Sequence, residues 1–145
     1  MTTHRVFVFG TLKQGFPNFA TNTGARVPGE YATLLPHPLY LVGERHSPWM
    51  LAQPGEGLPV RGQVFEVDGA ALQRMDALER IDAADGYRRV LLAVQRTDSP
   101  AAPSTVEVWA YLKPPEQLNP SDIRVGPLAC YTLAHAALYR PRAAA

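Results

Sequence analysis

Prolines recur along much of the chain and limit the length of its regular elements. The sequence holds 14 prolines in 145 residues, about twice the usual share. Because proline donates no hydrogen bond within a sheet and disfavours helix interiors, this content predicts short elements joined by many shaped loops. Long helices are not expected.

The length and composition indicate a single domain. A chain of 145 residues can bury one hydrophobic core, and its contents of 46% hydrophobic and 19% charged residues are ordinary for a globular protein. Neither an internal repeat nor a linker long enough to divide the chain is visible. We therefore expect one domain over residues 1–145.

The charge pattern argues against polyanionic partners. The formal net charge is +1, which gives no long-range field, and the basic residues are scattered rather than gathered in a run. We therefore expect neither nucleic acid nor a membrane among the partners. The sequence does not define an oligomeric state.

Two features favour the cytoplasm. The first predicted strand begins near His4 and leaves no room for a signal peptide, and no apolar run approaches ~18 residues. Cys130 is the single cysteine and cannot form an internal disulfide, which agrees with a reducing compartment. We therefore expect a cytoplasmic protein.

Short runs of aromatic and branched residues, bounded by turn-forming residues, predict strands. The expected strands cover residues 5–9, 26–34, 38–43, 48–53, 60–67, 87–96 and 106–112. Two stretches, 60–67 and 90–94, partly alternate apolar and polar side chains, as antiparallel strands do. We therefore expect an α+β fold, with a curled, mostly antiparallel sheet or barrel and few short helices.

The clearest helix is expected over residues 70–80, with Asp68 as its N-cap. A second helix is expected over residues 128–139, which are rich in alanine and leucine. Stretches rich in glycine, proline or serine at residues 53–59 and 99–104 are expected to form surface loops.

Glu79 is the first candidate for chemistry. Steps of about 100° per residue place Leu72, Met75 and Glu79 on one face of the expected helix. A carboxylate beside apolar side chains is costly to bury unless it is paired or its pKa is raised, and such an environment suits a general acid/base. The alternative is that Glu79 ends a frayed helix and meets only solvent or Arg80.

The second candidate is the loop that follows the first predicted strand. Its residues are Phe9, Gly10, Thr11 and Leu12. Successive N–H groups in such a turn can cradle a carboxylate or a phosphate. The loop is not a nucleotide P-loop, because Phe16 and Pro17 stand where that motif requires Lys and then Ser or Thr. By itself it is equally compatible with an ordinary tight turn.

Metal and nucleophile chemistry have little support in the sequence. The four histidines, His4, His37, His46 and His135, lie far apart without the spacing of metal ligands, so we expect no metal. Cys130 needs a basic partner to act as a nucleophile, and His135 on the expected helix would point to another face. We expect Cys130 to be a packed, inert thiol. No Gly-x-Ser-x-Gly elbow is present, which excludes a hydrolase of that class.

Several segments form an ordered series along the chain. They are Val6-Phe-Val-Phe-Gly-Thr-Leu-Lys-Gln-Gly-Phe-Pro-Asn18, Pro38-Leu-Tyr-Leu-Val-Gly-Glu44, Ser47-Pro-Trp-Met-Leu51, Gly62-Gln-Val-Phe-Glu-Val-Asp68, Leu72-Gln-Arg-Met-Asp-Ala-Leu-Glu79 and Gly86-Tyr-Arg-Arg89. The series resembles the gamma-glutamylamine cyclotransferases of the gamma-glutamylcyclotransferase-like (AIG2-like) family. The likeness covers about residues 4–112.

The resemblance implies a small mixed fold and a reaction without a cofactor. In that reaction the alpha-amine of a gamma-glutamyl amine attacks the gamma-carbonyl of the same molecule and releases 5-oxoproline and an amine. Glu79 matches the family's catalytic glutamate, and the loop from Phe9 to Leu12 matches its substrate loop. Phe9 replaces the tyrosine usual in the family, and the segment from Pro114 onward matches poorly.

The substrate stays open at this point. Three kinds of substrate suit this reaction class: gamma-glutamyl amines, gamma-glutamyl-lysine from degraded crosslinks, and a gamma-glutamyl-protected intermediate of antibiotic biosynthesis. In the third case the enzyme would remove the protecting group. A non-catalytic small-carboxylate-binding protein of the same fold is the alternative from another class. Glu79 argues against it, because a buried negative charge gives little to a binder of an anionic glutamyl group.

Overall fold

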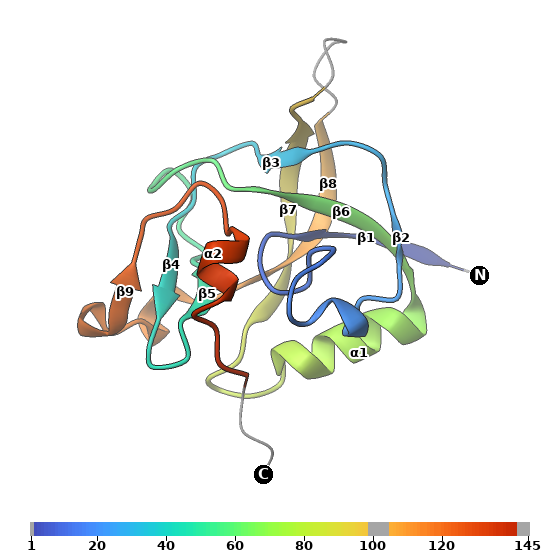
Figure 1. Ribbon diagram of the computed structural model, residues 1–145. Helices are drawn as coiled ribbons and strands as arrows, with labels where there is room; N and C mark the ends of the chain where they lie inside the picture. Colours follow the sequence, from blue (N-terminus) through green and yellow to red (C-terminus); the bar gives the residue numbers. More distant parts are fainter. Residues whose placement is uncertain (1, 99–104, 142–145) are drawn as a thin grey trace.

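A closed ring of strands forms the centre of the computed structural model, which describes residues 2–98 and 105–141 (Figure 1). Around the ring the order is β1 (Thr3–Val8), β8 (Thr105–Leu112), β7 (Arg88–Arg96), β3 (Tyr31–Thr33) and β6 (Arg61–Asp68). Strand β6 then pairs with β1 and closes the ring. The short strand β2 (Ala25–Arg26) pairs with β6 outside this circuit.

Neighbouring strands of the ring are antiparallel, with one exception, the parallel pair of β1 and β8. Strand β1 is paired on both edges and covered on both faces, because Phe7 belongs to one buried cluster and Val6 and Val8 to another, so all three side chains are buried. The expected α+β fold with a curled, mostly antiparallel sheet is confirmed.

A second sheet lies beside the ring, at the left of Figure 1. It contains β5 (Ser47–Met50), β4 (Leu39–Val42) and β9 (Ile123–Val125), in that order, and all its pairs are antiparallel. Leu51, just after β5, forms a bridge to Lys113, just after β8. This bridge attaches the second sheet to the ring.

The main helix, α1 (Gly69–Glu79), follows directly from β6. The Asp68 side chain accepts a hydrogen bond from the Ala71 N–H at 2.8 Å, so the predicted N-cap is confirmed. The other helical segments are short. They are η1 (Phe19–Thr21), η2 (Pro115–Gln117), η3 (Pro120–Asp122) and α2 (Leu133–Ala136).

The helix expected over residues 128–139 is wrong for most of its length. Only Leu133–Ala136 is α-helical. The Leu128 N–H donates to the Leu39 carbonyl at 2.8 Å, and the Arg61 N–H donates to the Ala129 carbonyl at 2.8 Å. These backbone groups are engaged with β4 and β6, so they do not take part in a helix.

The strand expected over residues 26–34 is also divided. Strands β2 and β3 are separated by a turn in which Gly29 has φ of 115°, a left-handed conformation that interrupts strand pairing and favours glycine. Strand β9 was not expected. The loop expected over residues 99–104 lies outside the described residues.

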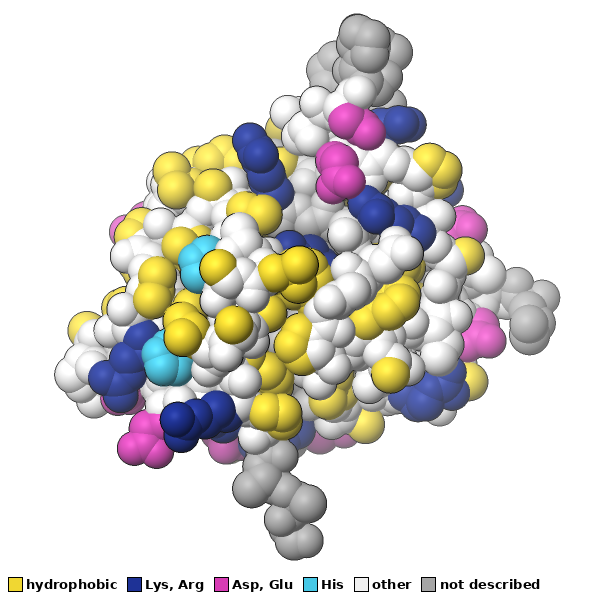
Figure 2. Space-filling model, in the orientation of Figure 1, with side chains coloured by type: hydrophobic (Ala, Val, Ile, Leu, Met, Phe, Trp, Pro, Cys, Tyr) yellow, Lys and Arg dark blue, Asp and Glu magenta, His cyan; other side chains and the backbone are white. Residues whose placement is uncertain are grey.

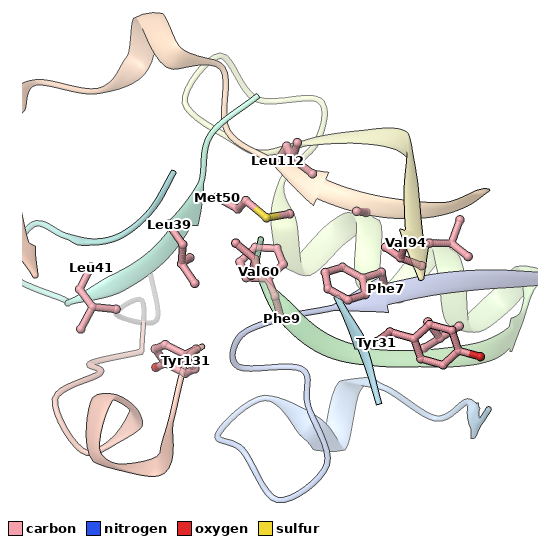
Figure 3. Packing of buried hydrophobic residues seen from close by; sticks show 13 residues of the cluster. Phe7, Phe9, Tyr31, Leu39, Leu41, Met50, Val60, Val94, Leu112 and Tyr131 are labelled. Atoms are coloured by element: carbon pink, nitrogen blue, oxygen red, sulfur yellow. The ribbon is translucent and has the colours of Figure 1, made fainter. Parts of the chain in front are cut away.

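The interior of the molecule contains two groups of buried side chains. The larger one, part of which Figure 3 shows, joins the ring to the second sheet through residues such as Phe7, Leu39 and Tyr131. The smaller one packs α1 against the outer face of β1 and β6, with Met75 fully buried between them. Helix α1 is therefore held against the ring along its apolar side.

Charged side chains of both signs are dispersed over the face drawn in Figure 2. Among the helices within residues 2–98 and 105–141, none has the length and apolar character needed to cross a bilayer.

Candidate active site

A cavity of about 330 Å³ lies where the end of β1, the end of α1 and the β4–β5 hairpin meet. Every residue predicted for the site lines this cavity. These residues are Phe9, Gly10, Thr11, Leu12 and Glu79. Other lining residues include Asn18, Arg45, Ser47, Pro48, Tyr87, Tyr111 and Tyr139. The structure thus brings the predicted loop and the predicted carboxylate to one place.

The loop at residues 9–12 continues β1 without a break. Its glycine is required by close packing, because a Cβ atom at Gly10 would lie 2.9 Å from Cγ of Pro48. Phe9 is buried and packs near Phe7, with the ring centroids 6.4 Å apart. The aromatic ring before the glycine therefore belongs to the core as well as to the cavity wall.

The carbonyl groups of this loop are engaged by neighbouring residues. The Asn18 N–H donates to the Thr11 carbonyl at 2.8 Å, and the Asn22 side chain donates to the Leu12 carbonyl at 3.1 Å. Within the part of the chain that the structure describes, the N–H groups of residues 10–12 donate to no protein acceptor. These donors are therefore available to an anionic group in the cavity.

Glu79 is the last residue of α1 and is half-buried. On the same helix Leu72 and Met75 are buried, as their spacing predicted. After Glu79 the chain turns through Arg80, which has the left-handed values φ 53° and ψ 49°. The Tyr87 N–H then donates to the Glu79 carbonyl at 3.0 Å, which fixes the backbone that carries the carboxylate.

Tyr111 brings a phenol to the cavity wall from β8. Its hydroxyl donates to Oδ1 of Asp76 at 2.7 Å, and Nε of Arg89 donates to the same oxygen at 2.9 Å. Burial raises the pKa of Tyr111, and the hydrogen bond to Asp76 and the negative charges of Asp76 and Glu79 raise it further. The phenol therefore keeps its proton, directs it at Asp76, and offers its oxygen as an acceptor.

The sequence analysis assigned no role to several cavity residues. Asn18 donates to Oγ1 of Thr11 at 2.9 Å and to the hydroxyl of Tyr139 at 3.2 Å, and Tyr87 donates its hydroxyl proton to the Pro48 carbonyl at 2.8 Å. Asn18 and Tyr87 lie within the segments that resemble the family, so this resemblance could have identified them as site residues. No local pattern points to Tyr139.

Within residues 2–98 and 105–141, no three His, Cys, Asp or Glu side chains gather in an arrangement that could hold a metal ion. His135 is engaged with Thr132, whose N–H donates to its Nδ1 at 3.0 Å. Cys130 is a half-buried free thiol, whose Sγ lies 3.9 Å from the Tyr131 carbonyl oxygen.

The family model described as "Gamma-glutamyl cyclotransferase, AIG2-like" matches residues 6–128. The chain belongs to this family. Membership agrees with the resemblance carried by the loop at residues 9–12 and by the end of α1. The matched range also extends beyond Pro114, into the segment that resembles the family poorly.

Named relatives of this family member include a gamma-glutamylaminecyclotransferase of Homo sapiens, which is 36% identical over 126 residues, covering 77% of this chain and 81% of the human protein. Gamma-glutamylaminecyclotransferase B of Danio rerio is 33% identical over 122 residues, covering 79% of this chain and 63% of the zebrafish protein. The crystal structure of an AIG2-like protein from Mus musculus superimposes with a TM-score of 0.81 at 29% identity, covering 98% of both chains.

Proposed function

We propose that this chain is a gamma-glutamylamine cyclotransferase, which releases 5-oxoproline and a free amine from a gamma-glutamyl amine. The observation that carries the proposal is that Glu79 and the loop at residues 9–12 line one cavity. Family membership and the names of the human and zebrafish relatives support the same activity.

In this proposal the loop at residues 9–12 anchors the glutamyl end of the substrate. The N–H groups of Gly10, Thr11 and Leu12 have no acceptor within the described chain, and the alpha-carboxylate supplies one. Hydrogen bonds to a charged acceptor are shorter and stronger than neutral ones. Because the loop is already fixed by Asn18 and Asn22, little ordering is needed when the substrate binds.

Glu79 moves the protons. It takes one proton from the alpha-ammonium group, so that the alpha nitrogen can attack the gamma-carbonyl carbon and form the ring C–N bond. Glu79 then gives this proton to the leaving nitrogen, the exocyclic C–N bond breaks, and the carbonyl of 5-oxoproline forms again. A second proton passes from the ring nitrogen to the departing amine, which leaves as an ammonium ion, so no net proton is gained or lost. One carboxyl group suffices, because it acts first as a base and then as an acid.

The substrate carries its own nucleophile, so the enclosed site needs only to orient it. Holding an intramolecular nucleophile near its target supplies much of the rate gain that a bimolecular reaction must obtain from an ordered complex. The scheme uses no cofactor. Hydrogen-bond donors of the cavity stabilise the oxyanion that forms on the gamma-carbonyl oxygen.

The direct test is to incubate the purified protein with a panel of gamma-glutamyl amines and to measure 5-oxoproline and free amine by mass spectrometry. The panel includes gamma-glutamyl-lysine and a gamma-glutamyl-protected antibiotic precursor. We expect equimolar release of the two products from at least one compound. Binding of the panel compounds without any 5-oxoproline would instead favour the non-catalytic carboxylate binder.

A further inference from the structure

Arg45 lies in the tight turn between β4 and β5, at residues 43–46. Two residues of this turn have left-handed backbone angles, Gly43 with φ of 72° and His46 with φ of 51°. The His46 N–H donates to the Gly43 carbonyl at 3.2 Å, and the Gly43 N–H donates to the Asp122 carbonyl at 2.9 Å. The turn that carries Arg45 is therefore held by one hydrogen bond within the turn and by another to the last residue of η3.

The C-terminal segment holds the Arg45 side chain in place. Nε of Arg45 donates to the Arg140 carbonyl at 2.9 Å, and the Arg140 N–H donates back to the Arg45 carbonyl at 2.9 Å. Nη2 of Arg45 donates to the hydroxyl of Tyr139 at 3.2 Å, and the guanidinium carbon lies 5.6 Å from the centroid of that ring. The guanidinium group is thus fixed at the wall of the cavity that Glu79 also lines.

The positive charge of Arg45 has no acidic partner in the described part of the chain. Five other arginines have a carboxylate oxygen within salt-bridge distance, namely Arg5, Arg26, Arg80, Arg89 and Arg96. Both acceptors of Arg45 are neutral oxygens, a carbonyl and a hydroxyl. A guanidinium group has five N–H donors in a planar fork that fits a carboxylate, so Arg45 retains donors and charge for an anion in the cavity.

Arg45 lies apart from the loop that anchors the glutamyl end. Among residues 2–98 and 105–141, the hydrogen bonds of Arg45 lead to that loop through two intermediate side chains, from Arg45 to Tyr139 at 3.2 Å, from Asn18 to Tyr139 at 3.2 Å, and from Asn18 to Thr11 at 2.9 Å. In the proposed function the N–H groups of residues 10–12 hold the alpha-carboxylate, which leaves the Arg45 guanidinium group for a second anionic group of the substrate. In a gamma-glutamyl amine, the remaining part that can carry a second anionic group is the amine half.

We propose that Arg45 is a specificity-determining residue that binds a carboxylate carried by the leaving amine. The preferred substrates are then gamma-glutamyl amines whose amine half ends in an acidic group, rather than simple alkylamine conjugates. This inference rests on the proposed cyclotransferase function. It concerns substrate selection and leaves the role of Glu79 unchanged.

The test compares substrates that differ only in this acidic group. The gamma-glutamyl conjugates of ε-aminocaproate and n-hexylamine form one pair, and those of γ-aminobutyrate and n-butylamine form a shorter pair. We expect the native protein to prefer the acidic member of at least one pair by about tenfold or more in kcat/KM, as measured by release of 5-oxoproline. In Arg45→Gln this ratio should fall to within about twofold of unity.

The split between the kinetic constants separates selection from a structural role. The contact with the leaving-group carboxylate is similar in the ground state and the transition state, so its loss should raise KM for the acidic substrate more than it lowers kcat. Arg45→Lys should keep part of the preference, because it keeps the charge but loses the fork. The matched control is Arg61→Gln, an exposed arginine on β6 that does not line the cavity, and it should keep the native ratio.

Three results would overturn the inference. If the native protein releases 5-oxoproline equally from both members of each pair, Arg45 does not select acidic amines, although the cyclotransferase function stands. The same holds if Arg45→Gln keeps the native preference. If no conjugate yields 5-oxoproline, the proposed function itself fails and this inference fails with it. Thermal unfolding of Arg45→Gln near the native Tm shows that a changed ratio reflects the cavity and not loss of the fold.

Discussion

The backbone N–H of Tyr87 donates to the carbonyl oxygen of Glu79 at 3.0 Å. This bond joins the segment just before β7 to the last residue of α1, so the backbone of the proposed catalytic residue is held by the ring. The chain between them is fixed by Arg88, whose Nη1 donates to the carbonyls of Ile81 and Ala83 at 3.2 and 2.9 Å. The position of Glu79 thus depends in part on Ile81, Ala83 and Arg88, which are not among the residues that line the cavity.

Glu79→Gln should lower kcat by about 100-fold or more, because the amide keeps the shape of the side chain and cannot shuttle a proton. Release of 5-oxoproline measures the effect, and circular dichroism and Tm check the fold. A variant that retains turnover within about tenfold of the native protein would remove Glu79 from the proposed mechanism.

Gly86→Ala should disturb the end of α1 and lower both stability and turnover. A Cβ atom at this position would lie 1.8 Å from the Arg80 carbonyl oxygen, a backbone atom that cannot rotate away. We expect a loss of about 2 kcal/mol or more in the free energy of unfolding, measured with urea. Gly69→Ala is the matched control, since nothing lies within 4 Å of its added Cβ. Equal stabilities of the two variants would contradict the tight packing at Gly86.

Thr11→Pro should abolish substrate binding, because it removes one N–H of the loop and fixes φ. Thr11→Ala should bind better than the proline variant, since it keeps the N–H and loses only the contact of Oγ1 with Asn18. Calorimetric titration with a Glu79→Gln background and an intact substrate compares them. Normal binding by the proline variant with failure of the alanine variant would show that the side chain, and not the backbone, anchors the substrate.

Phe9→Tyr should change kcat/KM by no more than a few fold. The ring of Phe9 is buried and packs near Phe7, so its role at this position is to support the loop. Steady-state kinetics decide the point. A rise well beyond a few fold would mean that the missing hydroxyl matters to catalysis, and that the native protein is a slow enzyme for that reason.

Tyr131→Phe should leave the stability at neutral pH unchanged within about 1 kcal/mol, because the buried hydroxyl of Tyr131 has no hydrogen-bond partner among the described residues. Burial raises the pKa of Tyr131, with a further contribution from Tyr139. The native state therefore binds a proton that the unfolded chain releases near pH ~10, and stability should fall as the pH rises beyond that value.

Because Tyr131→Phe lacks this ionisable hydroxyl, its free energy of unfolding should fall less than that of the native protein between neutral and strongly alkaline pH. Urea titrations across this range provide the measurement. Tyr111→Phe is the comparison, because the hydroxyl of Tyr111 donates a hydrogen bond to Asp76. Removing that hydroxyl should lower the free energy of unfolding by about 1 to 2 kcal/mol at neutral pH. A large loss from Tyr131→Phe at neutral pH would indicate an acceptor for that hydroxyl.

Local sequence patterns are sufficient to predict the parts of this fold that depend on residues close together in the chain. The Asp68 cap, the apolar face of α1 and the strand that leads into Gly10 depend on residues a few positions apart, and each is found where the pattern indicates. The resemblance assigned Glu79 and the loop at residues 9–12 to one site, and both line one cavity.

The remaining parts arise from contacts between distant segments. The hydrogen bonds of Arg45 to Tyr139 and Arg140 join the β4–β5 turn to the C-terminal segment. Neither segment contains a sequence motif that predicts this contact. The composition of residues 128–132 predicts a helix, whereas the Leu128 N–H is bonded to β4 and the Ala129 carbonyl to β6. A local pattern of side chains cannot predict where tertiary hydrogen bonds override helix propensity.

The ring of strands has no open edge at β1, because β6 and β8 occupy both of its sides. The loop at residues 9–12 grows out of this doubly bonded strand, whereas Arg45 and Tyr139 are carried by a hairpin turn and a C-terminal segment outside the ring (Figure 1). Under the proposed function, replacing residues in the turn or the C-terminal segment would change which amine is accepted without straining the strand that carries the loop at residues 9–12. In evolutionary terms, this separation allows an enzyme to keep its reaction and change its substrate through a few substitutions in the β4–β5 turn and the C-terminal segment.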